Sequence, residues 1–274
     1  MKKEVRIYSD GGGGQSNAVM VLQAAGKLPE PYDYFIFANV GNDSENPATL
    51  DYMEQYKKPF CEAHGIRFIE VQKTLRTGEL DTLVGMIDRT ERSVPIPARM
   101  SNGAPGNRSC TSTFKISVVD KWVKQNGYTH AVVGLGISLD ECHRMRDEQW
   151  HDTYGTKKIG YMKKREHPLI DLRLRRDDCY RIIAEAGLPI PPKSACFFCP
   201  FKKYSEWIQM RRDQPALFAE AVRIETVCNE KRFAMGKDQV FFHQSCTPLA
   251  DAVGLQLALP GFFDDASCGG YCHT

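Results

Sequence analysis

The feature that most constrains this chain of 274 residues is a run of four glycines between two apolar segments. Residues 5–8 read as a short strand, and residues 17–25 are apolar enough for a buried helix. Glycines let the backbone adopt positive φ angles and approach a ligand closely. The unpaired N–H groups at the start of a helix attract an anion. We therefore predict a phosphate-binding loop whose N–H groups, from residues 12–16, hold the phosphate. The loop reads Ser9-Asp10-Gly11-Gly12-Gly13-Gly14-Gln15-Ser16.

Three kinds of glycine loop compete for this segment. The P-loop of NTPases ends in Gly-Lys-Ser/Thr, and no lysine lies between Ser9 and Gly26. The dinucleotide fingerprint requires an acidic residue after the second strand, where this chain has Asn39, and its glycine spacing differs. The pyrophosphatase loop of adenine-nucleotide alpha-hydrolases, usually Ser-Gly-Gly-x-Asp-Ser, aligns at Ser16 with Gln15 in place of the aspartate. The third kind fits best.

Strand and helix patterns alternate along the first two thirds of the chain. After the glycine loop, strands are expected at residues 34–39, 67–71, 129–135 and 167–170, and the longest helix between them at 47–64. Such alternation predicts a three-layer, doubly wound α/β fold with a mostly parallel sheet of five strands. Ligands of such sheets bind at the carboxyl ends of the strands. We expect an adenine-nucleotide-binding domain over residues 1–190 and a helical, cysteine-rich region over 191–274.

Composition narrows the class of protein. The hydrophobic fraction of 42% supports a globular core, and a net charge of +2 does not by itself imply nucleic-acid binding. No apolar run is long enough to cross a bilayer, and the amino terminus carries no signal sequence. We therefore expect a cytoplasmic protein with no membrane partner. Ten cysteines in a reducing compartment indicate metal or redox chemistry rather than a disulfide framework.

Three cysteines carry the strongest metal signal. Cys196 and Cys199 are close in sequence, so that two thiolates across a tight turn can bind one ion or cluster. Cys110 precedes an expected helix, whose dipole would lower the pKa of the thiol and favour the thiolate. Thiolates suit an iron–sulfur cluster or zinc. Zinc would alternatively use Cys196, Cys199, His243 and Cys246. Other cysteines fit as small buried apolar residues: Cys61, Cys142, Cys179 and Cys228.

Charged residues gather just after the strand expected at residues 129–135. Gly136 and the acidic pair Asp140 and Glu141 follow it at the ligand-binding edge, with Arg144 four residues after Asp140 on one helical face. The alternative is a solvated start of a helix. Lys115 lies one turn into the helix next to Cys110 and would reach a cluster or an anion. Basic residues at 157–165 favour a solvated loop over a nucleic-acid contact.

Four segments of the chain resemble the PAPS reductase-like family of the adenine-nucleotide alpha-hydrolase superfamily and occur in the same order as in that family. They are the glycine loop, Cys110-Thr111-x-x-Phe114-Lys115, residues 136–146, and Ser194-Ala195-Cys196-x-x-Cys199-Pro200-Phe201. Within the family the chain looks most like the DndC-type sulfurtransferase branch. The resemblance implies a [4Fe–4S] cluster on Cys110, Cys196 and Cys199, with Cys272 as the fourth ligand and Cys268 as its rival. It also implies that Arg144 and Arg146 contact phosphate or sulfate.

These observations lead to a first hypothesis of an ATP pyrophosphatase coupled to sulfur transfer. ATP with Mg²⁺ would adenylate an acceptor, for which DNA, tRNA and a small molecule stay open, and a cysteine desulfurase or another donor would supply sulfur. A reductase of adenylylated sulfate and a nucleotide- or nucleic-acid-binding module with structural zinc are the alternatives. The expected nucleotide site comprises Ser9, Gly11, Gly12, Gly13, Gly14, Gln15, Ser16, Asn39, Gly136 and Arg146. The expected catalytic residues are Asp140, Glu141, Arg144 and Lys115.

Overall fold

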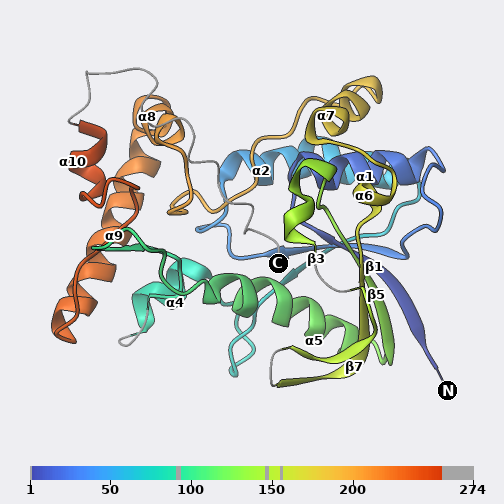
Figure 1. The fold of residues 1–274 in the computed structure, drawn as a ribbon, viewed down its shortest axis with the longest axis horizontal. Helices are drawn as coiled ribbons and strands as arrows, with labels where there is room; N and C mark the ends of the chain where they lie inside the picture. The colour runs from blue at the N-terminus through green and yellow to red at the C-terminus, as the bar shows by residue number, and fades with distance from the viewer. Residues whose placement is uncertain (1, 91–93, 146–147, 155–156, 255–274) are drawn as a thin grey trace.

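The computed structural model describes residues 2–90, 94–145, 148–154 and 157–254 (Figure 1). Its centre is a sheet of six strands in the order β3-β2-β1-β5-β7-β6. All neighbouring strands from β3 to β7 pair in parallel, and β6 pairs antiparallel to β7 at one edge. The predicted mostly parallel α/β sheet is confirmed. The strands are β1 (Glu4–Asp10), β2 (Tyr34–Asn39), β3 (Phe68–Gln72), β5 (His130–Leu135), β6 (His151–Tyr154) and β7 (Lys157–Glu166).

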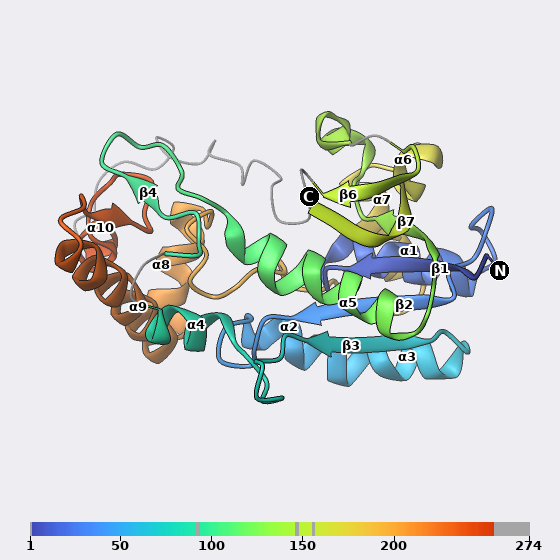
Figure 2. The same cartoon turned by 90° about the horizontal axis from the view of Figure 1, so that it is seen from below.

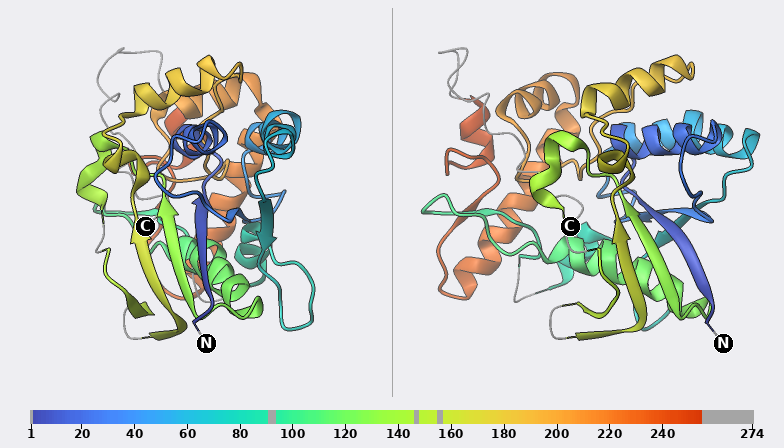
Figure 3. Two further views of the ribbon diagram at one scale, coloured as in Figure 1. Left: turned by 90° about the vertical axis from the view of Figure 1, so that its right-hand side faces the viewer. Right: turned by 45° about the vertical axis from the view of Figure 1, so that its right-hand side comes forward.

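Helices cover both faces of this sheet, which gives the three predicted layers (Figure 3). On one face, Tyr8 and Phe35 pack with the helices α1 (Gly14–Ala24), α3 (Lys58–Ala63) and α7 (Arg176–Glu185). On the other face, Ile7 and Val133 pack with α5 (Ser117–Gln125). The alternation of Ile7 and Tyr8 between the two faces follows from the two-residue period of a strand. The buried strands are therefore apolar on both sides, as parallel sheets require.

The fifth parallel strand lies elsewhere than predicted. Residues 167–170 were expected to form it, but Pro168–Asp171 is the short helix α6, and the strand is the preceding basic segment β7. The prediction failed because lysines concealed the strand pattern. Lys163 of β7 is buried, and its ammonium group pairs with Asp120 of α5 at 2.9 Å. That partner lies 43 residues away in the chain and leaves no local signal.

A second group of elements lies beside the sheet (Figure 2). Trp207 is fully buried there and packs in one apolar cluster with Leu83, Phe114 and Phe218. The antiparallel pair β4 (Arg99–Met100) and β8 (Val240–Phe241) flanks the cluster. The helices of this group are α4 (Leu83–Arg89), α8 (Tyr204–Asp213), α9 (Pro215–Ala234) and α10 (Leu249–Gly254).

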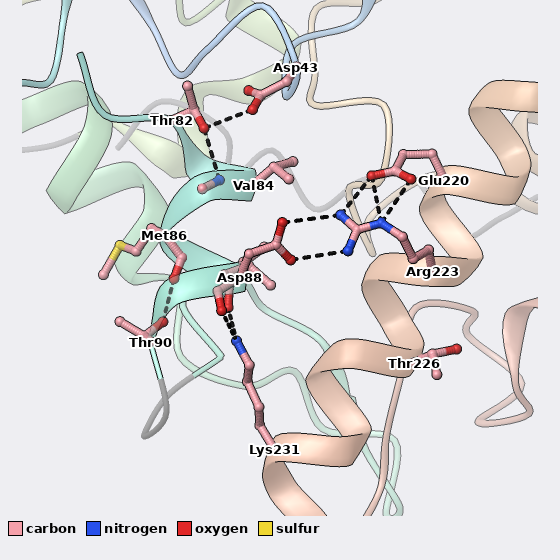
Figure 4. A network of polar contacts seen from close by, with 12 residues as sticks. Asp43, Thr82, Val84, Met86, Asp88, Thr90, Glu220, Arg223, Thr226 and Lys231 are labelled. Carbon is pink, nitrogen blue, oxygen red and sulfur yellow. Dashed lines mark hydrogen bonds and ion pairs between the residues drawn. The ribbon is translucent and has the colours of Figure 1, made fainter. Parts of the chain in front are cut away.

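Polar contacts join α4 to α9 at the edge of this cluster (Figure 4). The guanidinium of Arg223 contacts the carboxylate of Asp88 at 3.1 and 3.3 Å and also that of Glu220. Lys231 donates to the carbonyl of Asp88 at 2.9 Å. The side chains of Arg223 and Asp88 are 42% and 44% exposed, so their ion pair contributes little, and the apolar cluster dominates the stability of this contact.

Several short helices and helical turns adjoin the carboxyl edge of the sheet, where ligands are expected. The helix expected at residues 47–64 is α2 (Pro47–Tyr52), a π-helical turn η1 (Met53–Lys57) and α3 in succession. A second π-helical segment, η2 (Thr111–Ile116), precedes α5, and the 3₁₀ helix η3 (Leu139–Arg144) follows β5. None of the helices in the described part of the chain combines the length and apolar character that a membrane span needs.

Candidate functional site

The glycine loop connects β1 to α1 at the carboxyl edge of the sheet, as predicted. Gly12 has a φ of +75°, and a Cβ atom there would lie 2.4 Å from the Met53 side chain. A Cβ atom on Gly14 would lie 2.5 Å from the ring of Tyr180. Glycine is thus required at position 12 by conformation and space, and at position 14 by space alone.

Hydrogen bonds within the loop fix the direction of its N–H groups. The N–H of Gly11 donates to Ser16 Oγ at 3.0 Å, and that of Gly12 donates to Asp10 Oδ1 at 2.7 Å. In this arrangement the Gly12 N–H is directed to Asp10, so the predicted phosphate contact rests on the N–H groups that follow it. The N–H groups of the first turn of α1, from Gly14 onward, have no acceptor within the helix and remain suited to an anion.

A buried ion pair lies directly beneath the loop. Lys57 Nζ and Asp10 Oδ2 are 2.5 Å apart, and both side chains are fully buried. Lys57 ends the π-helical turn that also brings Met53 against Gly12. Such turns widen a helix locally and are often found at functional sites. Asp10 thus links the backbone of the loop to a lysine that belongs to no recognisable motif.

The loop opens on a cavity of about 280 Å³, here called the phosphate pocket. The predicted residues that line it come from the loop and from the segment after β5. Gly136 is close-packed, since a Cβ atom there would lie 2.7 Å from the Tyr8 hydroxyl. The lining residues predicted from the sequence are Ser9, Gly13, Gly14, Gln15, Ser16, Gly136, Glu141 and Arg144. Those not predicted are Arg176, Tyr180, Pro191, Pro192, Lys193, Ser194, Lys203 and Glu206.

Glu141 is the centre of the polar contacts in this pocket. Its Oε1 accepts from Arg176 at 2.6 Å, and its Oε2 accepts from Gln15 at 3.1 Å and lies 3.2 Å from Arg144 Nη1. Arg144 is only 7% exposed in its side chain, and its Nε and Nη2 atoms are buried without a protein partner in the described part of the chain. A buried guanidinium with unpaired N–H groups is costly unless a ligand accepts from it. Arg144 is therefore suited to bind an anion.

Asp140 has a different place from the one expected. It accepts from the backbone N–H of Arg176 at 3.0 Å, at the start of α7, and does not line the phosphate pocket. Burial would raise the pKa of Asp140, but the nearby Ser138 hydroxyl and the hydrogen bond from the Arg176 backbone hold that pKa below its ordinary value. The partner of Arg144 on the helix η3 is Glu141, three residues before it, and not Asp140 as predicted from an α-helical spacing.

Asn39 also lies away from the pocket-lining residues. Its amide donates to Glu70 Oε1 at 2.7 Å and to Asn42, and its oxygen accepts from the Gly41 N–H at 2.8 Å. The side chain is buried and holds the turn after β2. Asn39 is not among the residues that line the phosphate pocket, and its expected contact with the nucleotide stays a prediction. Arg146, also expected there, lies outside the described residues.

The three predicted cysteine ligands line a second cavity, here called the cysteine pocket. Cys196 and Cys199 form a tight turn in which the Cys199 N–H donates to the Cys196 carbonyl at 3.1 Å. The backbone of Cys196 also forms a bridge with Glu45. Cys110 comes from the start of η2, far earlier in the chain. The lining residues are Val40, Leu83, Pro97, Arg108, Cys110, Thr111, Lys115, Ser194, Ala195, Cys196, Cys199 and Phe201.

The protonation of Cys110 differs from the expectation. Burial raises the pKa of its thiol, and the nearby charges of Lys115 and Arg108 and a hydrogen bond with Thr111 offset this only in part. The predicted lowering of the pKa by a helix dipole is wrong, because burial in an apolar pocket is the larger effect. Lys115 lines the same pocket and lies 3.7 Å from the carboxylate of the buried Glu45.

Among the described residues, the cysteine pocket presents no ready site for a single metal ion. Within the described ranges, no three His, Cys, Asp or Glu side chains converge as they would around one metal ion. The alternative zinc set is not brought together: Cys246 Sγ lies 3.5 Å from the Met100 carbonyl, and His243 Nδ1 lies 2.7 Å from Ser245. A [4Fe–4S] cluster binds each cysteine through a different iron, which separates the thiolates. Cys268 and Cys272 lie outside the described residues.

The phosphate pocket does not fit a Mg²⁺ ion held by the protein. Of the described residues that line it, two carry carboxylates, Glu141 and Glu206. Both oxygens of Glu141 face guanidinium or amide groups, whereas Glu206 uses one oxygen, Oε2, to accept from Lys193 at 2.8 Å and from the Lys203 N–H at 2.7 Å. Mg²⁺ prefers carboxylates that are free to coordinate it. The Glu141 carboxylate is therefore fully engaged, and Glu206 is the one described lining residue with a carboxylate oxygen left to offer the predicted Mg²⁺.

Ser194 joins the two pockets. It lines both of them, and its hydroxyl donates to the carbonyl of Gly11. The sequence marks Ser194 only as a neighbour of the cysteine motif. The sequence contains no signal for Lys57, Tyr180 or Arg176, because each of them reaches the site through contacts between distant segments.

Comparison with known proteins places the chain far from characterised ones. No family model and no curated protein matches it. Among solved structures, the U34-tRNA thiolase NcsA from Methanococcus maripaludis, with its [4Fe-4S] cluster, is similar at 14% identity with a TM-score of 0.45. The match covers 95% of this chain and 84% of that one. A similarity this distant does not assign the chain to a family, so its function has to be inferred from the chemistry of the two pockets.

Proposed function

We propose that the protein is an ATP-dependent sulfurtransferase that adenylates its substrate, releases pyrophosphate and carries a [4Fe–4S] cluster. The observation that carries the proposal is the junction of the two pockets at Ser194. One pocket has the backbone N–H groups and the buried arginine that bind phosphates, and the other has three thiols. An acceptor activated in the first pocket therefore lies close to sulfur chemistry in the second.

In the adenylation step, an oxygen of the acceptor attacks the α-phosphorus of ATP. An O–P bond forms, the bond from the α-phosphorus to the bridging oxygen breaks, and pyrophosphate leaves with that electron pair. The first-turn N–H groups of α1 and the guanidinium of Arg144 would bind the departing phosphates. Fixed donors of this kind stabilise developing charge without reorganisation.

In the sulfur-transfer step, a hydrosulfide ion attacks the adenylated carbon or phosphorus. The new bond to sulfur forms as the bond to the AMP oxygen breaks, with no change in oxidation state. Cys110, Cys196 and Cys199 would hold the cluster, which supplies a site where sulfide binds. Lys115, which lines the same pocket, would attract the anionic sulfur nucleophile.

The acceptor we propose is a nucleic acid. Arg176, Lys193 and Lys203 lie at the phosphate pocket, and Arg176 is 46% exposed in its side chain. Cations beside a phosphate site suit an acceptor with its own phosphate backbone. The same groups would bind a smaller anionic acceptor less extensively.

The first experiment measures iron, zinc and acid-labile sulfide in protein purified without oxygen. We expect iron with matching sulfide, and nearly complete loss of both in Cys196→Ser. Cys142→Ser is the matched control, since Cys142, predicted to be buried, is exposed and lines neither pocket. Zinc without sulfide in the parent protein would contradict the proposal.

The second experiment measures turnover. The protein is incubated with ATP, sulfide and either bulk tRNA or DNA, and AMP, pyrophosphate and thiolated nucleotides are quantified by mass spectrometry. We expect thiolation of one nucleic acid that depends on ATP and is lost in Cys196→Ser. Release of sulfite from adenylylated sulfate, with no thiolation, would instead indicate the reductase.

A further inference from the structure

We propose that the phosphate pocket neutralises its ligand with arginine rather than with a divalent cation held by the protein. Arg144, positioned by Glu141, is the residue that does so. The inference deepens the proposed function and rests on its premise that nucleotide phosphates occupy this pocket.

Arg144 has hydrogen-bonding capacity that the described part of the chain leaves unused. One of its terminal nitrogens lies 3.2 Å from Glu141, while Nε and Nη2 are buried with no protein partner there. The side chain is more than nine-tenths buried and lines the cavity in front of the glycine loop. Two unpaired N–H directions on a planar guanidinium match two oxygens of one phosphate. Binding an anion would remove the cost of leaving them unpaired.

Two carboxylates in the described part of the chain, Glu141 and Asp10, are already engaged with cations, amides or backbone N–H groups. Glu141 binds Arg144, Arg176 and Gln15 at once, so it orients two cations and the loop instead of offering oxygens to a metal. Gln15 reinforces this, because its amide donates to Glu141 from the loop position where a pyrophosphatase loop usually carries an aspartate. Asp10, the remaining loop carboxylate, is fully buried against Lys57.

The charge that faces the cavity is positive before any metal binds. The described lining residues include the cations Arg144, Arg176, Lys193 and Lys203 and the carboxylates Glu141 and Glu206. Cations therefore outnumber carboxylates around the ligand. An ATP molecule without a metal ion is then a suitable ligand, since the protein supplies the charge that Mg²⁺ supplies elsewhere.

The test is the affinity for ATP and for inorganic pyrophosphate, measured by calorimetry with Mg²⁺ or with EDTA. For the parent protein we expect the two conditions to agree within about threefold. Arg144→Gln should weaken binding in EDTA by about ten- to a hundredfold, the range expected from losing charge-assisted hydrogen bonds. In this variant Mg²⁺ should partly restore ATP binding, a response that a purely structural role for Arg144 would not produce.

Two further variants complete the design. Arg144→Lys keeps the charge but loses the planar fork, and we expect it to bind ATP almost as weakly as Arg144→Gln. Arg181→Gln is the matched control on α7, because Arg181 is exposed and forms its ion pairs with Asp178 and Glu185 of its own helix. It should bind ATP as the parent does. Thermal melts verify that each variant is folded.

The outcomes separate this inference from the proposed function. Binding of ATP that is more than about tenfold tighter with Mg²⁺ in the parent, or unchanged affinity in Arg144→Gln, would overturn the inference. Failure of both ATP and pyrophosphate to bind would overturn it as well. If both bind through Arg144 without Mg²⁺ but no acceptor is adenylated or thiolated, the inference stands and the proposed function fails.

Discussion

The two pockets that meet at Ser194 differ in how their functional groups are held in place. The phosphate pocket is polar, and its groups are held before any ligand arrives, by the hydrogen bonds of the loop, by the Lys57–Asp10 pair and by Glu141. The cysteine pocket is mainly apolar, and burial keeps the Cys110 thiol protonated to higher pH than usual. The first site is thus preorganised by the fold, whereas in the second the Cys110 thiol has a pKa raised by burial.

If the buried Lys57–Asp10 pair preorganises the phosphate pocket, breaking this pair should cause the largest loss in the free energy of unfolding. Lys57→Met leaves Asp10 buried and uncompensated, and we expect a loss of about 3–5 kcal/mol in the free energy of unfolding. Urea denaturation measures it.

The double variant Asp10→Asn/Lys57→Met is the control for that experiment. It removes both charges while the asparagine oxygen can still accept from the Gly12 N–H. We expect it to recover much of the stability. A Lys57→Met protein as stable as the parent would show that the pair is not what supports the loop.

The helical group that contains the cysteine pocket is the apolar member of this comparison. It can be tested through His243, which belongs to this group. Burial, together with the charge of Arg99, lowers the pKa of His243 from 6.5 to about 4. Because the folded pKa lies below the unfolded one, the stability that neutral His243 contributes is complete above pH 6.5. It is lost as the pH falls toward about 4, by roughly 2–3 kcal/mol.

The measurement is urea denaturation of the parent and of His243→Leu between about pH 7 and pH 4. Carboxylates that titrate in the same range affect both proteins alike, so the difference between the two curves isolates the histidine. Equal pH dependence in the two proteins would mean that His243 is not held neutral by its surroundings.

Close packing around the glycine loop predicts an intermediate loss in the free energy of unfolding when a methyl group is added there. Gly14→Ala places a methyl group against the ring of Tyr180, and we expect a loss of about 1–3 kcal/mol. Gly13→Ala is the matched control, since its Cβ atom would lie at an ordinary 3.6 Å from Ser194. In a Tyr180→Ala background, Gly14→Ala should cost almost nothing. A cost that persists there would place the strain in the backbone instead.

The smallest loss in the free energy of unfolding is expected for a change at Ser194, which joins the two pockets. Ser194→Ala removes one hydrogen bond to the Gly11 carbonyl and should cost about 1 kcal/mol. Ser117→Ala is the control, because it removes a comparable bond from an exposed serine to the Thr113 carbonyl. We also expect ATP to change the alkylation rate of Cys196 in the parent but not in Ser194→Ala. An unchanged response would mean that the pockets communicate by another route.

The prediction of the fold succeeded where signals were local. The strand, the glycine loop and the helix follow one another within residues 4–24, so the pattern and the ligand-facing groups come from one segment. Cys196 and Cys199 were equally accessible to sequence reasoning because one tight turn brings them together. Where the pattern was ambiguous, as in the basic strand β7, the prediction named the wrong segment.

The prediction of the site was incomplete for a related reason. Asn39 ends β2 and Asp140 follows β5 at the carboxyl edge of the sheet, yet Asn39 holds a turn and Asp140 binds the start of α7. Chain position gives the edge on which a side chain lies, but competing hydrogen bonds decide where it points. Arg176 shows the reverse case, since it enters the pocket from a helix with no recognisable motif.

By itself, the sequence determined the α/β class, the glycine loop and the identity of the cysteines, because glycine conformation, strand period and thiol chemistry belong to single residues or short segments. Only the tertiary structure decided that Lys57 supports the loop, that Glu141 holds Gln15 and two arginines, and that Ser194 joins the two pockets. Those facts depend on burial and on partners from distant segments, and burial is a property of the folded chain.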